Sequence, residues 1–296
     1  MRVIVTGTSG FVGKTLLEQR FGLNDVLTLS TNSTTSTDET LRSEYDVETC
    51  SLILKKYQPD AILHLAGVMK SESSEEYFRV NLHYANTLLA SAREYNTSTK
   101  IVMIGTAAEY GVQGIESEPL SEINTCAPIS QYGLSKLAQT KLGLWYARNG
   151  VQAISCRPFN LIGPGQNDSF LLGKTTEYLK GVRNSSSNKL RKLQLGFLGD
   201  YRDFVDVRNF CDILVRILNE DDMNVKILNI CTGKPTLIRD TVKKAFELAK
   251  VPWYLCQEQE VNRAPTKIYG DTELFKSMFN SELNFNMDIV LSDMLG

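Results

Sequence analysis

A glycine-rich turn near the start of the chain constrains its fold more than any other feature. The stretch VTGTSGFVG spaces Gly7, Gly10 and Gly13 three residues apart, directly after the apolar run Arg2–Thr6 and before a helical stretch. In such a context the first glycine permits a tight turn, the second lets the backbone approach a pyrophosphate, and the third lets helix and strand pack closely. The helix N-terminus adds free N–H groups and a partial positive charge. The sequence therefore predicts a dinucleotide-binding turn, with an ordinary glycine-capped connection as the alternative.

Strand-like and helix-like stretches then alternate over roughly the first 165 residues. The expected strands are Arg2–Thr6, Val26–Ser30, Ala61–Leu65, Lys100–Gly105 and Gln152–Arg157. The expected helices are Lys14–Phe21, Glu48–Tyr57, Tyr77–Tyr95 and Tyr132–Asn149, and the polar stretch Thr31–Thr40 is expected to be a loop. Such alternation is typical of parallel strands joined by crossover helices. It predicts an α/β fold with a Rossmann-type, doubly wound parallel sheet.

The alternation loosens after Gly165, where short strands and polar turns follow one another. A helix at Asn209–Leu218 and a strand at Lys226–Cys231 are expected, and that strand could return to the main sheet. We therefore predict a dinucleotide-binding domain from 1–165 plus about 204–232. A smaller discontinuous α/β substrate lobe would comprise 166–203 plus 233–296.

Composition narrows the classes of function. The formal net charge is −2, without the basic excess of a general nucleic-acid binder, so no nucleic-acid partner is expected. The six cysteines form no C-x-x-C pair and no histidine lies at metal-ligand spacing, so we expect free thiols and no metal. No signal peptide or membrane helix is visible, which favours a cytoplasmic protein without a membrane partner.

The end of the second expected strand bears on the cofactor. A carboxylate there would hold the adenosine ribose hydroxyls of NAD, but this sequence has Ser30, Thr31 and Asn32. Without a carboxylate to repel a 2′-phosphate, the sequence favours NADP(H) and leaves NAD(H) open, with Asn32 as a cofactor-binding residue. Asp46 and Val47 could reach the adenine, although Asp46 could equally cap the helix that follows.

The segment QYGLSK supplies the candidate chemistry. Tyr132 and Lys136 lie four residues apart, which places them on one face of a helix. An ammonium near a phenol favours the phenolate and is expected to lower the Tyr132 pKa, so that Tyr132 could exchange a proton with a sugar oxygen. Thr106 ends the strand KIVMIGT, at the sheet edge where ligands bind, and could hydrogen-bond the same oxygen. The alternatives are an exposed helical pair and a strand-terminating cap.

Together with these pieces, the segments HLAG, IGTAAEYG, RPFNLIGPGQ and YRDFVDV occur in an order and spacing that give a resemblance over essentially the whole chain. The chain resembles the extended short-chain dehydrogenase/reductases that act on nucleotide-activated sugars. Within that family it is most similar to the reductases of nucleotide-linked 4-keto-6-deoxyhexoses. The resemblance implies a nucleotide-diphosphate sugar as substrate, a homodimer and a place in deoxysugar and surface-polysaccharide biosynthesis.

The resemblance also implies roles for individual residues. The catalytic residues would be Thr106, Tyr132 and Lys136. The cofactor-binding residues would be Gly7, Ser9, Gly10, Phe11, Val12, Gly13, Leu65, Ala66, Gly67 and Phe159, together with Tyr132 and Lys136. The substrate-binding residues would be Thr106, Asn160, Arg202 and Arg263, of which the two arginines would grip the diphosphate. Asn81 matches a position that supports the active-site network. The alternative for Arg202 is a salt bridge with Asp203 or Asp206.

One departure narrows the reaction. Related 4,6-dehydratases carry a carboxylate two residues after the catalytic Ser or Thr, whereas this chain has Ala108 there and Glu109 one residue later. Because elimination needs a positioned acid or base, dehydration is disfavoured and reduction of a C4 ketone by NAD(P)H is expected. The alternatives are an NAD-dependent 4-epimerase, which would return the hydride to the other face, and a non-catalytic protein that senses the cofactor.

Overall fold

The computed structural model describes residues 1–19, 22–23, 25–30, 39–40, 46–95, 98–185, 191–220 and 225–296. The chain forms two compact units, and each is assembled from separate segments. The first unit comprises Met1–Gly111, Glu122–Pro158 and Phe210–Asn229. The second unit comprises Val112–Ser121, Phe159–Asn209 and Ile230–Gly296.

A seven-stranded sheet forms the centre of the first unit. From one edge to the other its strands are β10 (Ile227–Ile230), β6 (Ala153–Pro158), β5 (Lys100–Ile104), β4 (Ala61–His64), β1 (Arg2–Thr6), β2 (Asp25–Ser30) and β3 (Glu39–Thr40). The ladders from β3 to β6 are all parallel. The predicted Rossmann-type sheet is thereby confirmed, and each predicted strand is present with its ends shifted by at most one residue.

The order of the strands creates a switch point beside β1. From β1 the chain runs to β2 and β3 on one side and then continues with β4 and β5 on the other side. Val5 lies opposite Thr28 of β2 and Leu63 of β4, so the carboxyl ends of these strands reach the same edge of the sheet. Ligands of open α/β sheets bind at such an edge, where the strand order reverses.

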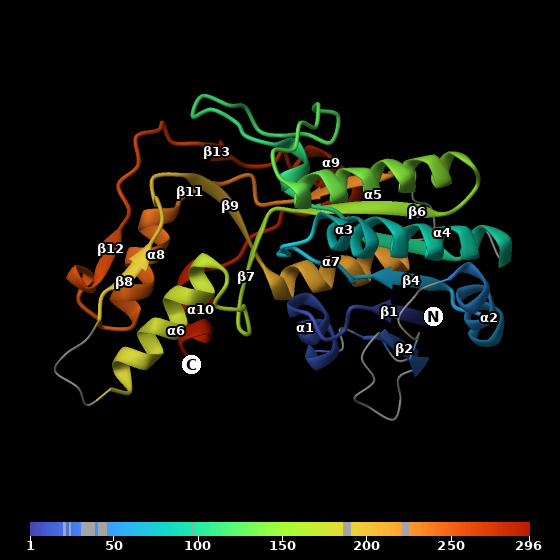
Figure 1. Ribbon diagram of the computed structural model, residues 1–296, viewed down its shortest axis with the longest axis horizontal. Helices are drawn as coiled ribbons and strands as arrows, with labels where there is room; N and C mark the ends of the chain where they lie inside the picture. Colours follow the sequence, from blue (N-terminus) through green and yellow to red (C-terminus); the bar gives the residue numbers. More distant parts are fainter. Residues whose placement is uncertain are drawn as a thin grey trace. The chain divides into compact units, whose positions relative to one another are not determined.

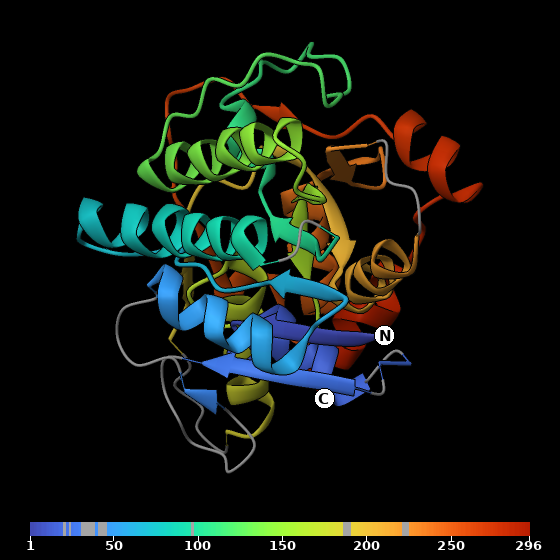
Figure 2. The same ribbon diagram turned by 90° about the vertical axis from the view of Figure 1, so that its right-hand side faces the viewer.

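Helices cover both faces of this sheet (Figure 1). They are α1 (Phe11–Gln19), α2 (Val47–Tyr57), α3 (Ser74–Phe78), the π-helical turn η1 (Arg79–His83), α4 (Tyr84–Tyr95), the short 3₁₀ turn η2 (Ala107–Tyr110), α5 (Gln131–Arg148) and α7 (Val207–Asn219). Figure 2 shows α2, α4 and α5 one after another across one face, where they bury apolar side chains such as Leu54, Leu88 and Tyr146 against the sheet. The predicted first helix begins earlier, at Phe11, and the helix predicted for Tyr77–Tyr95 begins at Ser74 and contains the π turn.

A buried lysine joins the sheet to α7. Lys100, at the start of β5, donates its ammonium protons to the carbonyl oxygens of Ile217 (3.1 Å) and Leu218 (3.0 Å), and also to that of Glu220. The last carbonyls of a helix lack partners within the helix, so this ammonium both satisfies them and complements the helix dipole. The contact fixes the C-terminus of α7 beside the start of β5.

The second unit contains two small sheets and several helices. Strand β9 (Tyr201–Asp206) pairs in parallel with β7 (Asn160–Ile162) and β13 (Lys267–Ile268) and antiparallel with β11 (Pro235–Leu237), while β8 (Leu193–Leu195) pairs with β12 (Cys256–Glu258). The helices that lie wholly in this unit are α6 (Leu171–Arg183), α8 (Ile238–Leu248), the 3₁₀ turn η3 (Trp253–Leu255), α9 (Glu273–Phe279) and α10 (Met287–Leu295). Leu179, Phe246 and Leu291 are core residues shared by α6, α8 and α10. No helix among the residues that the structure describes is both long and apolar enough to cross a membrane.

Candidate active site

The predicted catalytic hydroxyls meet at the carboxyl end of β5. Thr106 follows that strand in an extended conformation and caps η2, where its Oγ1 accepts the Ala108 N–H at 3.2 Å. Tyr132 lies in the first turn of α5 and shares a hydrogen bond with the Thr106 side chain. A Cβ at Gly133 would lie only 2.7 Å from the Ala108 carbonyl oxygen, so α5 can approach η2 this closely because residue 133 is glycine.

The Lys136 ammonium lies one helical turn further along α5 and is buried. It donates to the Ile104 carbonyl oxygen at 2.8 Å and to Gln139 Oε1 at 3.0 Å. Gln139 in turn donates its own N–H to the same Ile104 oxygen at 3.1 Å. Burial lowers the pKa of Lys136 to about 8, and the negative charge of Glu109 opposes that shift. The Lys136 amine therefore titrates at a pH at which the folded protein can be studied.

The pKa of Tyr132 differs from the sequence-based expectation. Burial raises it to about 12, the hydrogen bond with Thr106 opposes the rise, and the charge of Glu109 adds to it. The prediction that Lys136 lowers this pKa was therefore wrong, because the desolvation of the phenolate outweighs the favourable effects. The phenol holds its proton at neutral pH in this structure.

The glycine turn after β1 has the shape that a dinucleotide requires. Gly7 adopts a positive φ of 72°, and a Cβ there would lie 2.5 Å from the Ala66 backbone nitrogen. A Cβ at Gly13 would lie 2.4 Å from the Gly7 carbonyl oxygen, whereas one at Gly10 would meet only that oxygen, at 3.3 Å. Space is thus open outside Gly10, beside the N-terminus of α1 at Phe11. The residues present fit a bound pyrophosphate, with Ser9 exposed and Phe11 and Val12 half-buried next to it.

Asn81 ties the loop after β4 to the catalytic helix. It lies in the π turn η1, and its side-chain amide accepts from the Val68 N–H at 2.8 Å and donates to the Val68 carbonyl at 2.9 Å. The same amide nitrogen donates to Ser135 Oγ, also at 2.9 Å. A Cβ at Gly67 would lie 3.2 Å from both Asn81 Oδ1 and Lys136 Nζ. The structure therefore brings Leu65–Gly67, the glycine turn and the catalytic helix together.

The sequence reasoning missed a buried ion pair behind Thr106. Glu109 and Arg157 pair at 2.8 Å, with side chains that are 0% and 2% exposed. Glu109 Oε1 also accepts from the Thr106 N–H at 3.0 Å and from Thr140 Oγ1 at 3.1 Å. The signal available in the sequence was the pair of charges within IGTAAEYG and RPFN, two segments that end neighbouring strands of the predicted sheet.

Comparison with known proteins places the chain in a family. The model of the NAD dependent epimerase/dehydratase family matches residues 3–231. The chain belongs to this family. It is 31% identical over 239 residues to GDP-6-deoxy-D-talose 4-dehydrogenase from Aggregatibacter actinomycetemcomitans, which covers 79% of this chain and 75% of that relative. It is 30% identical over 264 residues to GDP-6-deoxy-D-mannose reductase from Pseudomonas aeruginosa, which covers 87% of this chain and 83% of that relative.

A solved structure has the same fold. The structure of RMD from Pseudomonas aeruginosa complexed with NADPH matches this epimerase/dehydratase family member with a TM-score of 0.83 at 23% sequence identity, over 99% of this chain and 97% of that one. The resemblance to extended short-chain dehydrogenase/reductases is confirmed, as are the Rossmann-like fold and the prediction of an NAD(P)-dependent oxidoreductase.

At the predicted adenine end, the structure of this family member shows the helix cap. Asp46 caps α2, because its carboxylate accepts from the Thr49 N–H and from Thr49 Oγ1, each at 2.7 Å. The cap interpretation of Asp46 is therefore confirmed. Val47, the first residue of α2, is half-buried, and Asn32 lies outside the described residues.

The remaining predicted residues belong to the second unit. Phe159 is buried, and Asn160 is exposed at the start of β7. Arg263 binds Asp200 through two hydrogen bonds of 2.8 and 2.6 Å, and Arg202 approaches the same carboxylate at 3.4 Å. The alternative partners predicted for Arg202 were wrong in this structure.

The two aspartates predicted as alternatives have other partners. Asp203 accepts from the backbone N–H groups of Thr232 and Gly233, and Asp206 pairs with Arg208 at 2.7 Å. Each carboxylate therefore has partners other than Arg202. Arg202 therefore relies on Asp200, the residue that comes just before the strand.

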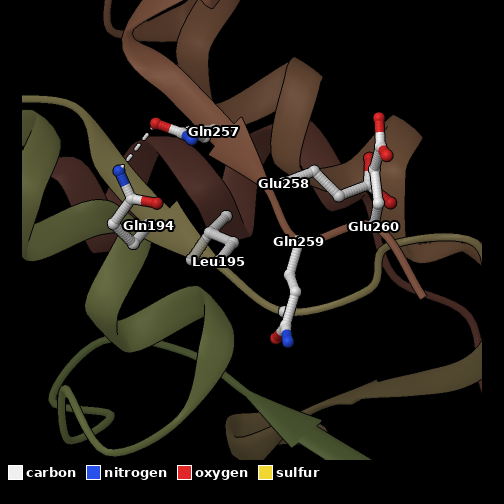
Figure 3. Close-up of a pocket in the computed structure, with 7 residues that line it drawn as sticks. Gln194, Leu195, Gln257, Glu258, Gln259 and Glu260 are labelled. Carbon is white, nitrogen blue, oxygen red and sulfur yellow. Dashed lines mark hydrogen bonds between the residues drawn. The ribbon is translucent and has the colours of Figure 1, made fainter.

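A polar hollow of about 530 Å³ also lies in the second unit, between the ends of β8 and β12 (Figure 3). Its lining residues are Gln194, Leu195, Gly196, Gln257, Glu258, Gln259 and Glu260. Gln194 donates to Gln257 at 2.9 Å, and Glu258 is bound to Arg239 and to the Leu198 N–H. None of the residues predicted from the sequence lines this hollow, and Glu258, one of its two charged residues, already has protein partners.

Proposed function

We propose that this chain reduces the C4 ketone of a nucleotide-diphosphate 4-keto-6-deoxyhexose to the corresponding 6-deoxyhexose, with NAD(P)H as the reductant. One observation carries the proposal. At the switch-point edge of a Rossmann-type sheet, the protonated Tyr132 phenol shares a hydrogen bond with the Thr106 hydroxyl, one helical turn from the buried Lys136 ammonium. The similarity to a GDP-6-deoxy-D-mannose reductase supports the substrate class.

In this mechanism the residues of the chain handle the proton and the orientation of the carbonyl. A bound nicotinamide cofactor would supply the hydride to C4. Thr106 would donate a hydrogen bond to the C4 oxygen and hold it beside Tyr132, which would give its proton to that oxygen as negative charge develops there. Lys136 has two of its protons engaged by Ile104 and Gln139, so the third would serve the ribose hydroxyls of the cofactor.

Two features of the first unit support reduction over water elimination. Residue 108 is alanine, which can neither give nor accept a proton. The nearby carboxylate of Glu109 is fully buried and is occupied by Arg157 and the Thr106 N–H. A dehydratase needs a carboxyl group that reaches the substrate, and the described residues around Thr106 provide none that is free to do so.

The proposal assigns the dinucleotide to the first unit and the nucleotide sugar to the second. Gly7, Gly10 and Gly13 would hold the pyrophosphate of the cofactor, for which NADP(H) is the proposed form. Arg202 and Arg263 would bind the diphosphate of the sugar nucleotide, since a guanidinium can exchange one bidentate oxyanion partner, such as the Asp200 carboxylate, for another. A homodimer is part of the proposal, and light scattering of the purified protein would test it.

The test is a turnover assay on a panel of nucleotide-linked 4-keto-6-deoxy sugars, with NADPH and NADH in parallel. We expect stoichiometric loss of the reduced cofactor's absorbance and an NMR spectrum of a 6-deoxyhexose with a hydroxyl at C4. An epimerase would convert a nucleotide sugar without consuming added cofactor, and a sensor protein would bind the cofactor without turnover. Either result would replace the proposed reduction.

A further inference from the structure

The Glu109 carboxylate is the one charged group of the first unit that contacts the Thr106 backbone, among the hydrogen bonds of the described residues. It is fully buried, and its two oxygens are held from three sides by the Thr106 N–H, Thr140 Oγ1 and Arg157 Nε. Thr140 also shares a 2.9 Å hydrogen bond with Ser155. Such a fully satisfied buried network fixes its members in one geometry.

The network holds the end of β5 together with Lys136. The Ile104 carbonyl receives Lys136 and Gln139, Gly105 donates to the Cys156 carbonyl at 2.7 Å, and the Thr106 N–H goes to Glu109. A Cβ on Gly105 would lie 2.5 Å from the carboxylate oxygen, so the strand passes directly against it. The two successive peptide groups that join Ile104, Gly105 and Thr106 are thus held in place, and they position the Thr106 hydroxyl beside Tyr132.

The same carboxylate also sets the electrostatics of the site. Arg157 stays charged at all accessible pH values and pairs with the Glu109 carboxylate at 2.8 Å. Burial raises the pKa of Glu109, and the charge of Arg157 opposes that rise. The negative charge of Glu109 raises the pKa of Lys136 and of Tyr132, in the first case against burial and in the second case together with it. The other titratable neighbours are Cys126 and Tyr110, which both accept from Arg157, and His64 of β4.

Those three neighbours bring no compensating charge. Burial raises the pKa of Tyr110, so its phenol keeps its proton. Burial is the main cause that lowers the pKa of His64 to about 3, so the imidazole is neutral, and burial raises the pKa of Cys126, so the thiol keeps its proton. Glu109 is therefore the negative charge to which Lys136 and Tyr132 respond.

We propose that Glu109 is a positioning residue for the reaction at Thr106 and Tyr132, because it binds the Thr106 N–H, and that its carboxylate, paired with Arg157, supplies the buried negative charge of the site. The inference rests on the proposed function, because only the reductive direction requires Tyr132 to hold its proton before the reaction. The underlying electrostatic effect, however, is a property of the chain alone and can be measured without substrate.

The experiment follows Lys136 by NMR in protein labelled with ¹³C at the lysine ε carbons, with Lys136→Arg used to assign the resonance. In the wild type we expect a titration near pH 8. Glu109→Gln removes the charge but keeps an amide oxygen within reach of the Thr106 N–H, and it should lower the Lys136 pKa by about one unit, the size of effect typical of a nearby opposite charge. Thr140→Val removes one hydrogen bond to the Glu109 carboxylate but keeps the negative charge of that carboxylate. It should therefore leave the Lys136 pKa unchanged.

A conservative replacement separates position from charge. Glu109→Asp keeps the charge but shortens the side chain by one methylene, so it should leave the Lys136 pKa near its wild-type value while turnover falls about tenfold, because a small misplacement of a catalytic group has effects of that order or larger. Unchanged turnover in Glu109→Asp would overturn the positioning role, and an unchanged Lys136 pKa in Glu109→Gln would overturn the electrostatic role.

A second variant covers the case in which the unpaired Arg157 prevents Glu109→Gln from folding. Glu109→Gln combined with Arg157→Gln leaves neither buried charge unpaired. Because Glu109 is the partner that acts on Lys136, the double variant should lower the same pKa, and no change would refute the inference. If the wild type reduces none of the keto sugars, the proposed reduction fails while the titrations still decide the role of the Glu109 charge.

Discussion

Two charged clusters of this protein, one in each unit, hold their arginines in different ways. In the first unit, the side chains of Arg157 and Glu109 are 2% and 0% exposed and pair with each other at 2.8 Å. In the second unit, the Arg263 side chain is 45% exposed and lies over the Phe197 ring, and it meets an Asp200 side chain that is 8% exposed. The first cluster is therefore fixed before any ligand arrives, whereas the second keeps a guanidinium within reach of solvent.

The difference in exposure indicates that the first cluster is preorganised, whereas the arginine of the second cluster can exchange its partner. Groups that stabilise a developing charge are most effective when they do not reorganise during the reaction, which suits the network behind Thr106 and Tyr132. A guanidinium that grips a diphosphate must release its resting partner, which suits the partly exposed pair at Asp200. The comparison predicts that changes in the first cluster act on turnover and that changes in the second act on substrate affinity.

The largest expected effect comes from the acid itself. Tyr132→Phe should reduce turnover by about 10²–10⁴-fold, the usual range for a lost general acid, and leave binding of the reduced cofactor nearly intact. Steady-state kinetics and fluorescence titration with NADPH measure the two quantities. Tyr254→Phe, at an exposed tyrosine of the second unit, is the matched control. Near-normal turnover in Tyr132→Phe would remove that residue from its assigned role.

The next effect tests the fixed geometry of the glycine turn. Gly13→Ala places a Cβ 2.4 Å from the Gly7 carbonyl oxygen, so either the turn moves or α1 does. We expect the dissociation constant for NADPH to rise by at least about tenfold and the protein to lose about 1–3 kcal/mol of stability, the usual cost of overpacking. Gly181→Ala in α6, where nothing lies within 4 Å of the added Cβ, should be neutral or slightly stabilising in thermal melts. Equal behaviour of the two variants would contradict the close-contact argument.

A smaller effect tests the exchangeable cluster. Arg263→Ala should raise KM for the nucleotide sugar by about tenfold with little change in kcat, because a diphosphate contact made equally in ground and transition states affects binding alone. Arg183→Ala, at the exposed end of α6, serves as the control. A fall in kcat at constant KM would place Arg263 with the catalytic residues and remove the contrast between the clusters.

The smallest effect is an acid-dependent loss of stability at Asp200. Burial acts to raise its pKa, but hydrogen bonds from Arg263 and Thr266 outweigh it and hold the pKa at about 2. A folded-state pKa below the unfolded value means that the contribution is present above about pH 4 and is lost as the pH falls toward 2. Urea unfolding of wild type and Asp200→Asn between pH 2 and 7 should converge at the acid end. Parallel curves throughout would contradict the shift.

The sequence predicted the parts of the site that depend on local spacing. Gly7, Gly10 and Gly13 follow a strand, and Tyr132 and Lys136 share a helix face, so short-range periodicity was sufficient to propose them. Thr106 could be placed because the end of a parallel strand is a known position in such sheets. The same reasoning gave the strands of the main sheet to within one residue, except β3 (Glu39–Thr40), which lies in a stretch that was predicted to be a loop.

The parts that escaped prediction depend on contacts between distant segments. Glu109 and Arg157 are 48 positions apart and meet only because β5 and β6 are neighbours. Asp200 and Arg263 are 63 positions apart. The raised pKa of Tyr132 followed from its burial, which the spacing of residues does not reveal. Pairwise chemistry was readable from the sequence, whereas desolvation and long-range pairing required the fold.

Lys100, which joins β5 to α7, has a consequence for folding during synthesis on the ribosome. The carbonyls that receive the Lys100 ammonium lie 117 and 118 positions further along the chain, and the edge strand β10 follows them. In a nascent chain that has emerged only as far as β6, the edge of β6 that later pairs with β10 is open to other chains. The Lys100 ammonium also lacks the α7 carbonyls that bind it in the folded protein. The N-terminal half cannot finish folding until most of the polypeptide has been translated, which makes chaperone protection during synthesis valuable for this topology.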